Sequence, residues 1–222
     1  MQNRYYGRTE EDKFVLYVTE KKTHGFFVDL GSKHPIHENP TFLLEKDYQW
    51  KGIYAPATEL SLSSPLLQER RCNVSPLPTP TDYKSWFQGN EIPPHVDFLN
   101  INLNVDDGTA KHTIEVFDRD IFTEHQFTVV VFRHDIYRTN EKQTRDIARN
   151  IMKKHGYLLA IENMASINNM DVYQDWYVLG SRVDRDQIEN LRRKNEKSYQ
   201  YNRISGPSIN YMFVEYPPAS AS

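Results

Sequence analysis

The stretch Gly25-Phe26-Phe27-Val28-Asp29-Leu30-Gly31 decides the fold predicted for this chain. An apolar run that ends in Asp-x-Gly is typical of a buried parallel strand that opens into a loop cradling a cofactor. A nucleotide-binding loop then continues with small residues, because its backbone N–H groups must approach the ligand closely. This chain continues instead with Ser32-Lys33-His34-Pro35. We therefore expect a cofactor-binding fold whose cofactor site has been altered.

The apolar patterns on either side predict alternating strands and helices, the order that builds a parallel sheet covered by helices. The expected strands are 26–30, 52–56, 96–102 and 127–132, followed by an antiparallel hairpin of 157–162 and 175–179 around an Asn-rich loop at 163–170. The expected helices are 10–20, 41–46, 60–71, 138–155 and 184–197. Gly156 follows one of these helices, in the place expected for a left-handed C-cap. The predicted fold class is α/β, with a doubly wound, mostly parallel sheet and a C-terminal antiparallel hairpin.

Residues 73–94 differ in composition, since they are rich in Pro, Ser and Thr, and we expect them to form a long loop outside the folded layers. Trp86 and Phe87 within it are expected to cover a sheet edge or fill a partner's groove, with capping of a ligand as the alternative. Residues 1–183 form the expected α/β domain. Residues 184–222 form a helix and a Tyr- and Pro-containing tail that packs on this domain or extends from it.

Composition narrows the class of protein. The 222 residues are 38% hydrophobic, enough for an ample core, and the formal charge of -3 provides no global attraction to nucleic acid or to an anionic membrane. Cys72 is the single cysteine, so an internal disulfide and a thiolate metal cluster are excluded. No apolar run approaches the roughly 20 residues that span a bilayer, and the N-terminus lacks an apolar signal region. The sequence is interpreted as that of a soluble intracellular protein.

Four places in the chain carry a resemblance to a known family. They are Gly7-Arg8-Thr9-Glu10-Glu11-Asp12-Lys13, the 25–31 stretch, Val96-Asp97-Phe98-Leu99, and residues 129–137 followed by His155-Gly156-Tyr157 and Asp175-Trp176-Tyr177-Val178. In order and spacing, over about residues 6–179, they resemble the FkbM family of S-adenosylmethionine-dependent methyltransferases. The resemblance implies a Rossmann-like class I methyltransferase fold and S-adenosylmethionine as cofactor. It also implies cofactor-binding roles for Asp29, Gly31, Asp97 and Asn102, and a role as catalytic base for His134.

The departures from the family pattern fall on the functional positions. The family loop A-N-D-G is replaced by residues 32–35, and Ala55 stands where the family has the acid that binds the ribose hydroxyls. The family stretch L-D-V-E-G becomes residues 101–105, in which Asn102 and Asn104 replace both carboxylates. An amide can hold a hydrogen bond but cannot act as a base or balance a sulfonium charge. Arg133 replaces a family glutamate and adds a fixed positive charge beside His134.

Two functions of different classes remain open. The first is a methyltransferase-like pseudoenzyme that does not bind S-adenosylmethionine and serves as an interaction or structural subunit for an unknown protein partner or larger assembly. The second is an active O-methyltransferase acting on a hydroxyl of a sugar or another small acceptor. In that case His134 would be the base, and Asp29 and Gly31 would frame the methyl donor.

Other candidate sites have simpler interpretations. His34, His37 and Glu38 carry groups that suit zinc or iron, but three polar residues in a Pro-containing loop are more typical of a solvated turn, and no metal site is expected. Residues 192–194 are interpreted as the basic surface of a helix, with phosphate contact as the minor alternative. No Ser/His/Asp arrangement indicates hydrolase chemistry.

Overall fold

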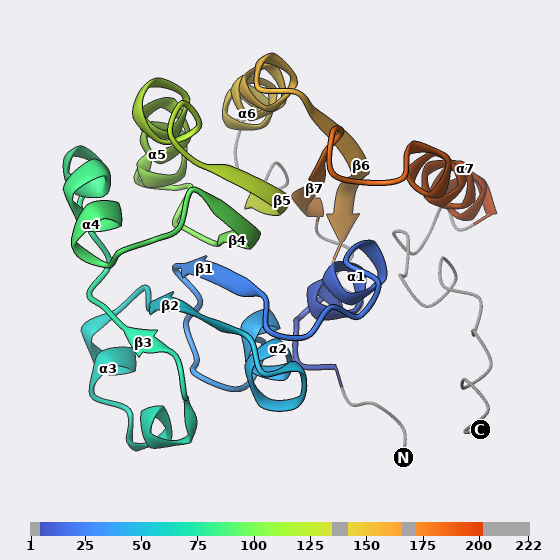
Figure 1. Ribbon diagram of the computed structural model, residues 1–222. Coiled ribbons are helices and arrows are strands. Elements are labelled where there is room, and N and C mark those ends of the chain that lie inside the picture. The colour runs from blue at the N-terminus through green and yellow to red at the C-terminus, as the bar shows by residue number, and fades with distance from the viewer. Residues whose placement is uncertain (1–4, 135–141, 166–171, 202–222) are drawn as a thin grey trace, which may run out of the picture.

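A computed structural model describes residues 5–134, 142–165 and 172–201, and shows one seven-stranded sheet with the strand order β3-β2-β1-β4-β5-β7-β6. The strands are β1 (Phe26–Leu30), β2 (Lys51–Ala55), β3 (Asn73–Val74), β4 (His95–Ile101), β5 (Gln126–Arg133), β6 (Tyr157–Ala165) and β7 (Val172–Leu179). β1 to β5 pair in parallel, whereas β7 is antiparallel to both β5 and β6 (Figure 1). The predicted α/β class, the parallel sheet and the closing hairpin are confirmed.

Helices cover both faces of this sheet (Figure 1). α1 (Glu11–Val18), α2 (Pro40–Tyr48) and α7 (Arg185–Tyr201) lie on one face, and α4 (Tyr83–Gly89), α5 (Thr109–Val116) and α6 (Lys142–Lys154) on the other. Successive side chains of a strand point to opposite faces, so Phe27 packs with the α1 side and Val28 with the α4 side. Both faces are therefore buried, which explains the continuous apolar run of β1.

The Pro-rich region contains more structure than the sequence predicted. The prediction of one helix over residues 60–71 is wrong. The segment forms two short helices, α3 (Glu59–Leu62) and the 3-10 helix η1 (Pro65–Glu69), and the side chain of Ser64 caps the second one. The loop expected over 73–94 is also corrected, since it contains β3, the 3-10 helix η2 (Pro80–Asp82) and α4. Phe87 of α4 is buried in the core, and the Trp86 indole donates to Ser75 Oγ at 2.9 Å. Burial of aromatic side chains thus folds residues 73–94 onto the sheet, which their composition alone did not predict.

The second half of the chain agrees better with the predictions. α6 presents Ile151 and Met152 to the core, and Gly156 has the left-handed φ of 81° expected of a C-cap. α5 and the π-helical turn η3 (Phe117–Ile121) were not predicted, because apolar and polar residues alternate there without a clear signal. Ile188 and Leu191 of α7 join the α1-side core. Parts of three predictions lie outside the described residues: the start of the helix expected over 138–155, most of the loop expected at 163–170, and residues 202–222 of the C-terminal tail.

Within the described residues, no helix combines the length and the apolar character that crossing a membrane requires.

Asp12 in the first turn of α1 makes the stability of the fold dependent on pH. Its carboxylate accepts the backbone N–H groups of Tyr6 at 2.6 Å and Gly7 at 3.3 Å. Burial outweighs these bonds and raises the pKa of Asp12 from 3.8 to about 7. Because the folded-state pKa lies above the unfolded one, the stabilisation is complete below pH 4 and is lost as the pH rises through 7, by at most about 1.4 kcal/mol per pH unit.

We expect the free energy of unfolding of wild type minus that of Asp12→Asn to fall between pH 4 and pH 7. Asparagine cannot titrate, and its missing acceptor oxygen lowers stability equally at every pH. Urea unfolding of both proteins from pH 4 to pH 8 measures the difference. A difference that stays constant or rises with pH would contradict this assignment.

Candidate functional site

The candidate site lies at the carboxyl ends of the parallel strands, where open α/β sheets bind their ligands. Leu30 at the end of β1 pairs with Ala55 of β2 and with Ile101 of β4, and Ile101 pairs with Phe132 of β5. Gly31, Asn102 and His134 follow the ends of these strands. The structure therefore places three of the predicted site residues at one edge.

Gly31 has a role that needs no ligand. Its φ is +93°, and an added Cβ would lie 2.6 Å from the backbone oxygen of Asn102. The Gly31 N–H donates to the Ala55 carbonyl at 2.8 Å, and the Asn102 N–H donates to the Leu30 carbonyl at 2.8 Å. Glycine is thus required where the ends of three strands converge.

Asp29 points into the protein and is satisfied there by side chains. Its Oδ1 accepts from Ser32 Oγ at 2.7 Å and from Asn100 Nδ2 at 2.8 Å, and Oδ2 lies 3.4 Å from Thr41 Oγ1. Burial raises the pKa of Asp29, and the hydrogen bonds from Ser32 and Asn100 oppose this effect only in part. Side chains thus satisfy the Asp29 carboxylate inside the protein, without a cofactor.

The loop after Gly31 uses its own polar groups to hold itself together. His34 Nδ1 accepts the backbone N–H groups of Ile36 at 3.0 Å and His37 at 2.9 Å. Burial and the neighbouring His37 lower the pKa of His34, which favours the neutral ring that can accept these bonds. Ser61 Oγ donates to the Lys33 carbonyl at 2.5 Å. The backbone N–H groups of Ile36 and His37 are therefore bonded to His34 and are not free to bind an anion.

Arg70 holds the same loop through a buried network of hydrogen bonds. Its guanidinium is fully buried and donates to Glu45 Oε2 at 2.8 Å, to the Pro35 carbonyl at 2.7 Å and to Thr41 Oγ1 at 2.9 Å. It also lies over the Tyr54 ring, 4.8 Å from the centroid. Sequence reasoning missed Arg70 and Glu45, because their pairing joins segments that only the folded chain brings together.

Arg133 adds a positive charge at this edge. Its Nη1 donates to Asn102 Oδ1 at 3.3 Å, beside the close contact between Asn102 and Gly31. At the end of β2 the buried Ala55 offers only a methyl group. The edge therefore has a cation bonded to Asn102, whose backbone meets Gly31, and no carboxylate at the expected ribose position.

His134 is completely buried, and neither ring nitrogen has a hydrogen-bond partner in the part of the chain that is described. Its Nε2 lies 3.4 Å from Asp175 Oδ1. Arg149 binds Asp175 with two bonds of 2.7 and 3.0 Å, and the Tyr177 hydroxyl donates to it at 3.2 Å. Burial alone would raise the pKa of Asp175, but the nearby His134 ring and the bonds from Arg149 lower it below its ordinary value. The sequence drew attention to 175–178 as a strand and missed this charged cluster.

Asp97 does not join this site. It lies near the start of β4, at the amino edge of the sheet, where it accepts from the Phe26 N–H at 2.9 Å and from Lys22 Nζ at 2.8 Å. Parallel strands carry their beginnings and ends at opposite edges, so Asp97 is separated from Gly31 by the length of the sheet. The sequence analysis grouped Asp97 with Asp29, Gly31 and Asn102, but the structure places Asp97 at the opposite edge of the sheet.

The remaining candidates occupy the surface. His37 and Glu38 are exposed, and the described residues contain no cluster of three His, Cys, Asp or Glu groups that could hold a metal ion. Arg192 and Arg193 are exposed on α7, where each lies within 4 Å of Glu189, at 3.5 and 3.6 Å. This arrangement agrees with the interpretation of residues 192 and 193 as a solvated helix surface.

The strand order, with an antiparallel β7 inserted between β5 and β6, defines the class I S-adenosylmethionine-dependent methyltransferase fold. One solved structure is similar over most of its length. A Clostridium thermocellum protein assigned as an rRNA methylase is 10% identical, with a TM-score of 0.50 over 80% of this chain and 97% of that one.

Two further structures are similar at lower scores. A Pyrococcus horikoshii protein assigned as an RNA methyltransferase is 14% identical, with a TM-score of 0.47 over 77% of this chain and 82% of that one. Aeropyrum pernix fibrillarin, with natively bound S-adenosylmethionine, is 10% identical, with a TM-score of 0.46 over 71% of this chain and 67% of that one. No family model and no curated protein matches the chain. The FkbM resemblance therefore stays a prediction.

Proposed function

We propose that this methyltransferase-fold protein is a divergent relative of the FkbM family that does not bind S-adenosylmethionine, and that it acts as a non-catalytic interaction or structural subunit. The observation that carries the proposal is the guanidinium of Arg133, which is held by Asn102 beside Gly31. A methyl donor at the carboxyl edge would bring its cationic sulfonium towards this fixed charge.

Magnitudes support a large loss of affinity. If the guanidinium came about 5 Å from the sulfonium, the two like charges would cost on the order of 3 kcal/mol at an effective dielectric constant of 20. The carboxylate–diol contact that Ala55 cannot make contributes about 1.5–3 kcal/mol. Together these terms remove over half of the about 8 kcal/mol that a micromolar Kd represents. The expected Kd is therefore about millimolar or weaker.

The loop after β1 supports the same conclusion. The N–H groups of Ile36 and His37 are bonded to His34, and the Pro35 carbonyl is bonded to the buried Arg70. To bind a cofactor, the loop would have to exchange these internal bonds for bonds to the ligand. This exchange costs free energy that a preorganised glycine-rich loop does not require.

Calorimetric titration with S-adenosylmethionine and S-adenosylhomocysteine tests the proposal. We expect no saturable heat for wild type, and measurable binding for the double variant Ala55→Asp, Arg133→Gln, which restores the acid and removes the cation. The charge-matched control Arg119→Gln changes an exposed arginine paired with Asp120 and should behave as wild type. A low-micromolar Kd for wild type would refute the loss of the cofactor.

An active O-methyltransferase is the second candidate, and the His134–Asp175 pair favours it. A carboxylate 3.4 Å from a buried imidazole can orient the ring as a general base. In this reading His134 would take the proton of a sugar or other small hydroxyl, and a methyl donor held at this edge would supply the methyl group to that oxygen and leave as S-adenosylhomocysteine. Methyl label on any such acceptor, lost in His134→Gln with S-adenosylhomocysteine affinity unchanged, would establish this function in place of the first.

A further inference from the structure

The loop between β1 and α2 is fastened on both sides of its middle. On the side of β1, the buried Arg70 guanidinium donates to the Pro35 carbonyl at 2.7 Å. On the side of α2, the Asn39 side chain, which also caps that helix, donates to the His34 carbonyl at 3.0 Å. Guanidinium, carboxamide and backbone carbonyl groups do not titrate near neutral pH. These two contacts are therefore independent of pH in that range.

The middle of the loop, residues 36–38, is held through the His34 ring. Its Nδ1 accepts two backbone N–H groups, from Ile36 at 3.0 Å and from His37 at 2.9 Å. The Ile36 side chain is buried, and Glu38 has a left-handed φ of 54°, whose cost these bonds offset. A backbone N–H can only donate, so both bonds require a lone pair on Nδ1. A proton on Nδ1 removes the acceptor and leaves donors facing each other.

The surroundings of His34 favour the neutral ring at neutral pH. Charged side chains of the loop and of the elements packed on it are Lys33, Glu38, Asp29, Glu45 and Arg70. Burial and His37, whose ring centroid lies 4.7 Å away, lower the pKa of His34 from its ordinary value of 6.5, and Glu38 opposes them only in part. Because the folded-state pKa lies below the unfolded one, the closed loop is fully stabilised above pH 6.5. The stabilisation is lost as the pH falls below 6.5 towards the folded-state pKa.

We propose that this loop is an acid-sensitive switch, in which protonation of His34 at Nδ1 releases residues 36–38 while the contacts of Arg70 and Asn39 remain. Release exposes Ile36 and frees two backbone N–H groups at the carboxyl edge, beside a cationic ring. The access of a ligand or a protein partner to this edge therefore depends on pH. The switch belongs to the loop alone and is independent of whether the edge binds S-adenosylmethionine.

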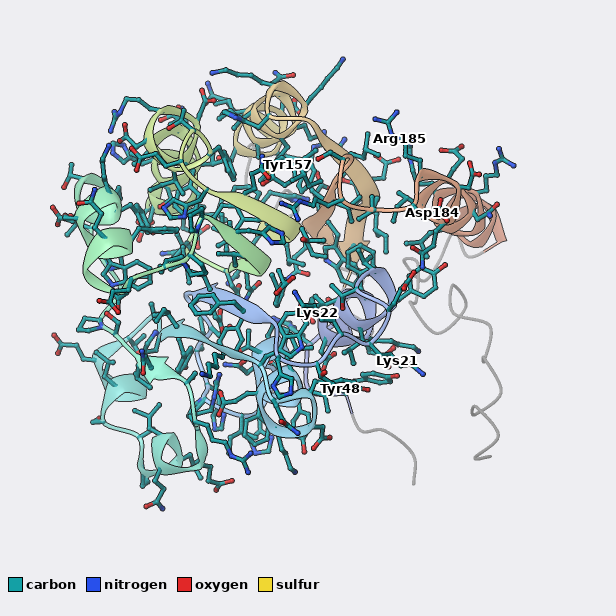
Figure 2. The ribbon with its side chains drawn as sticks, in the orientation of Figure 1. Lys21, Lys22, Tyr48, Tyr157, Asp184 and Arg185 are labelled. Atoms are coloured by element: carbon teal, nitrogen blue, oxygen red, sulfur yellow. The ribbon has the colours of Figure 1, made fainter. Side chains whose placement is uncertain are left out.

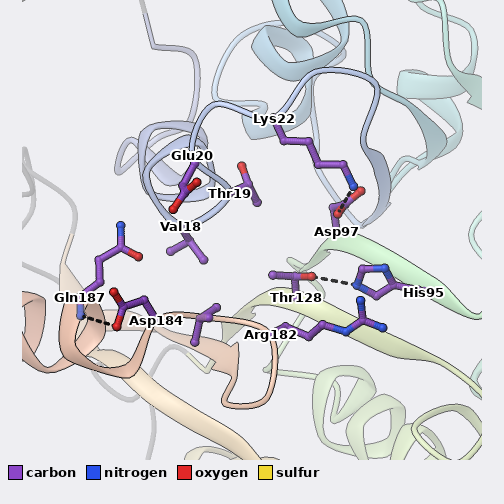
Figure 3. A pocket seen from close by; sticks show the side chains of 11 residues that line it. Val18, Thr19, Glu20, Lys22, His95, Asp97, Thr128, Arg182, Asp184 and Gln187 are labelled. Atoms are coloured by element: carbon purple, nitrogen blue, oxygen red, sulfur yellow. Dashed lines mark hydrogen bonds and ion pairs between the residues drawn. The ribbon is translucent and has the colours of Figure 1, made fainter.

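A second histidine shows why the kind of partner matters. His95 lies at the amino edge of the sheet, together with Lys22, which Figure 2 labels, in the wall of a pocket of about 340 Å³ (Figure 3). Burial and the charge of Arg182 lower the pKa of His95 as well. Its Nε2, however, is bonded to Thr128 Oγ1 at 2.9 Å, and a hydroxyl can accept as well as donate. This bond therefore survives protonation of His95, whereas the two bonds of His34 do not.

Amide hydrogen exchange, followed by NMR from pH 7.5 to pH 5, tests the switch. In wild type we expect the protection factors of the Ile36 and His37 N–H groups to fall by up to about 10-fold per pH unit below pH 6.5, because the open loop binds a proton that the closed loop excludes. The midpoint of the His34 ring titration should lie below pH 6.5. Val28, buried in β1, should remain more strongly protected than Ile36 throughout, because the loop opens without unfolding of the sheet.

His34→Asn separates the acceptor from the proton. The carboxamide oxygen of asparagine accepts the N–H two residues further on and does not titrate, so the protection of Ile36 should persist down to pH 5. His34→Ala lacks an acceptor, and its Ile36 and His37 N–H groups should exchange rapidly at every pH.

Two control variants keep His34. His37→Gln should retain the pH dependence, with its midpoint at higher pH, because a neighbouring cation that opposes protonation of His34 is removed. His95→Gln should behave as wild type at the loop, since His95 lies at the opposite edge of the sheet.

Four results would overturn the switch. The first is wild-type protection of Ile36 and His37 that does not decrease below pH 6.5, and the second is a decrease in His34→Asn equal to that in wild type. Loss of the pH dependence in His37→Gln would assign the titration to that ring instead. Equal protection of Val28 and Ile36 would show that the loop opens only when the whole sheet unfolds.

Discussion

Replacing Arg70 by glutamine is expected to lower the free energy of unfolding by about 3–5 kcal/mol, the cost of removing one partner of a buried ion pair. Glu45 would remain buried without its counter-charge, since the side chains of both residues are almost fully shielded from solvent. The bond from Arg70 to the Pro35 carbonyl would be lost as well. Urea unfolding followed by circular dichroism measures the change.

Two further variants make the Arg70 prediction specific. Arg70→Met combined with Glu45→Gln removes both charges, so it should be more stable than Arg70→Gln alone. Lys84→Gln breaks the exposed pair of Lys84 with Glu124 and should change stability by less than about 1 kcal/mol. Equal losses for Lys84→Gln and Arg70→Gln would show that burial does not set the strength of the Arg70 pair.

Gly31→Ala is expected to lower the free energy of unfolding by about 3 kcal/mol or more. Left-handed backbone at a residue with a Cβ costs about 1–2 kcal/mol, and the Cβ would also lie 2.6 Å from the Asn102 carbonyl oxygen. That oxygen is backbone at the end of β4, so relief requires the strand ends to separate. Chemical denaturation of the variant provides the measurement.

Gly108→Ala is the matched control for Gly31→Ala. Gly108 also has a positive φ, of 78°, but an added Cβ would meet nothing within 4 Å. It should therefore lose only the conformational term of about 1–2 kcal/mol. If both variants lost the same amount, the close approach of Gly31 and Asn102 would have no energetic weight.

The Gly31 comparison bears on function as well as on stability. In a cofactor-binding loop, a glycine is expected because the ligand approaches the backbone. Here contact between neighbouring strand ends is a sufficient reason for glycine. Asp29 is explained in a similar way by Ser32 and Asn100, which bind it inside the protein. These two residues can thus persist in a protein that binds no methyl donor.

Local patterns determined most of the fold. The apolar run of β1, the closing hairpin and the Gly156 cap were predictable because burial on two faces, alternation and a left-handed turn each restrict residue type over a few positions. The break between α3 and η1 and the short helix α4 were not. The break follows Ser64, whose side chain caps η1, whereas α4 depends on buried aromatic residues such as Phe87, which pack against partners distant in the chain.

The candidate site was predictable only in part. The sequence by itself determined that Gly31, Asn102 and His134 lie at or just after the ends of strands, because strand positions can be predicted from the hydrophobic pattern. Only the tertiary structure decided that Asp97 lies at the opposite edge and that Arg70 meets Glu45 across 25 residues. It also decided that His134 lies beside Asp175. Burial preferences are encoded residue by residue, whereas the partner of a charge depends on which distant segments the packed sheet brings together.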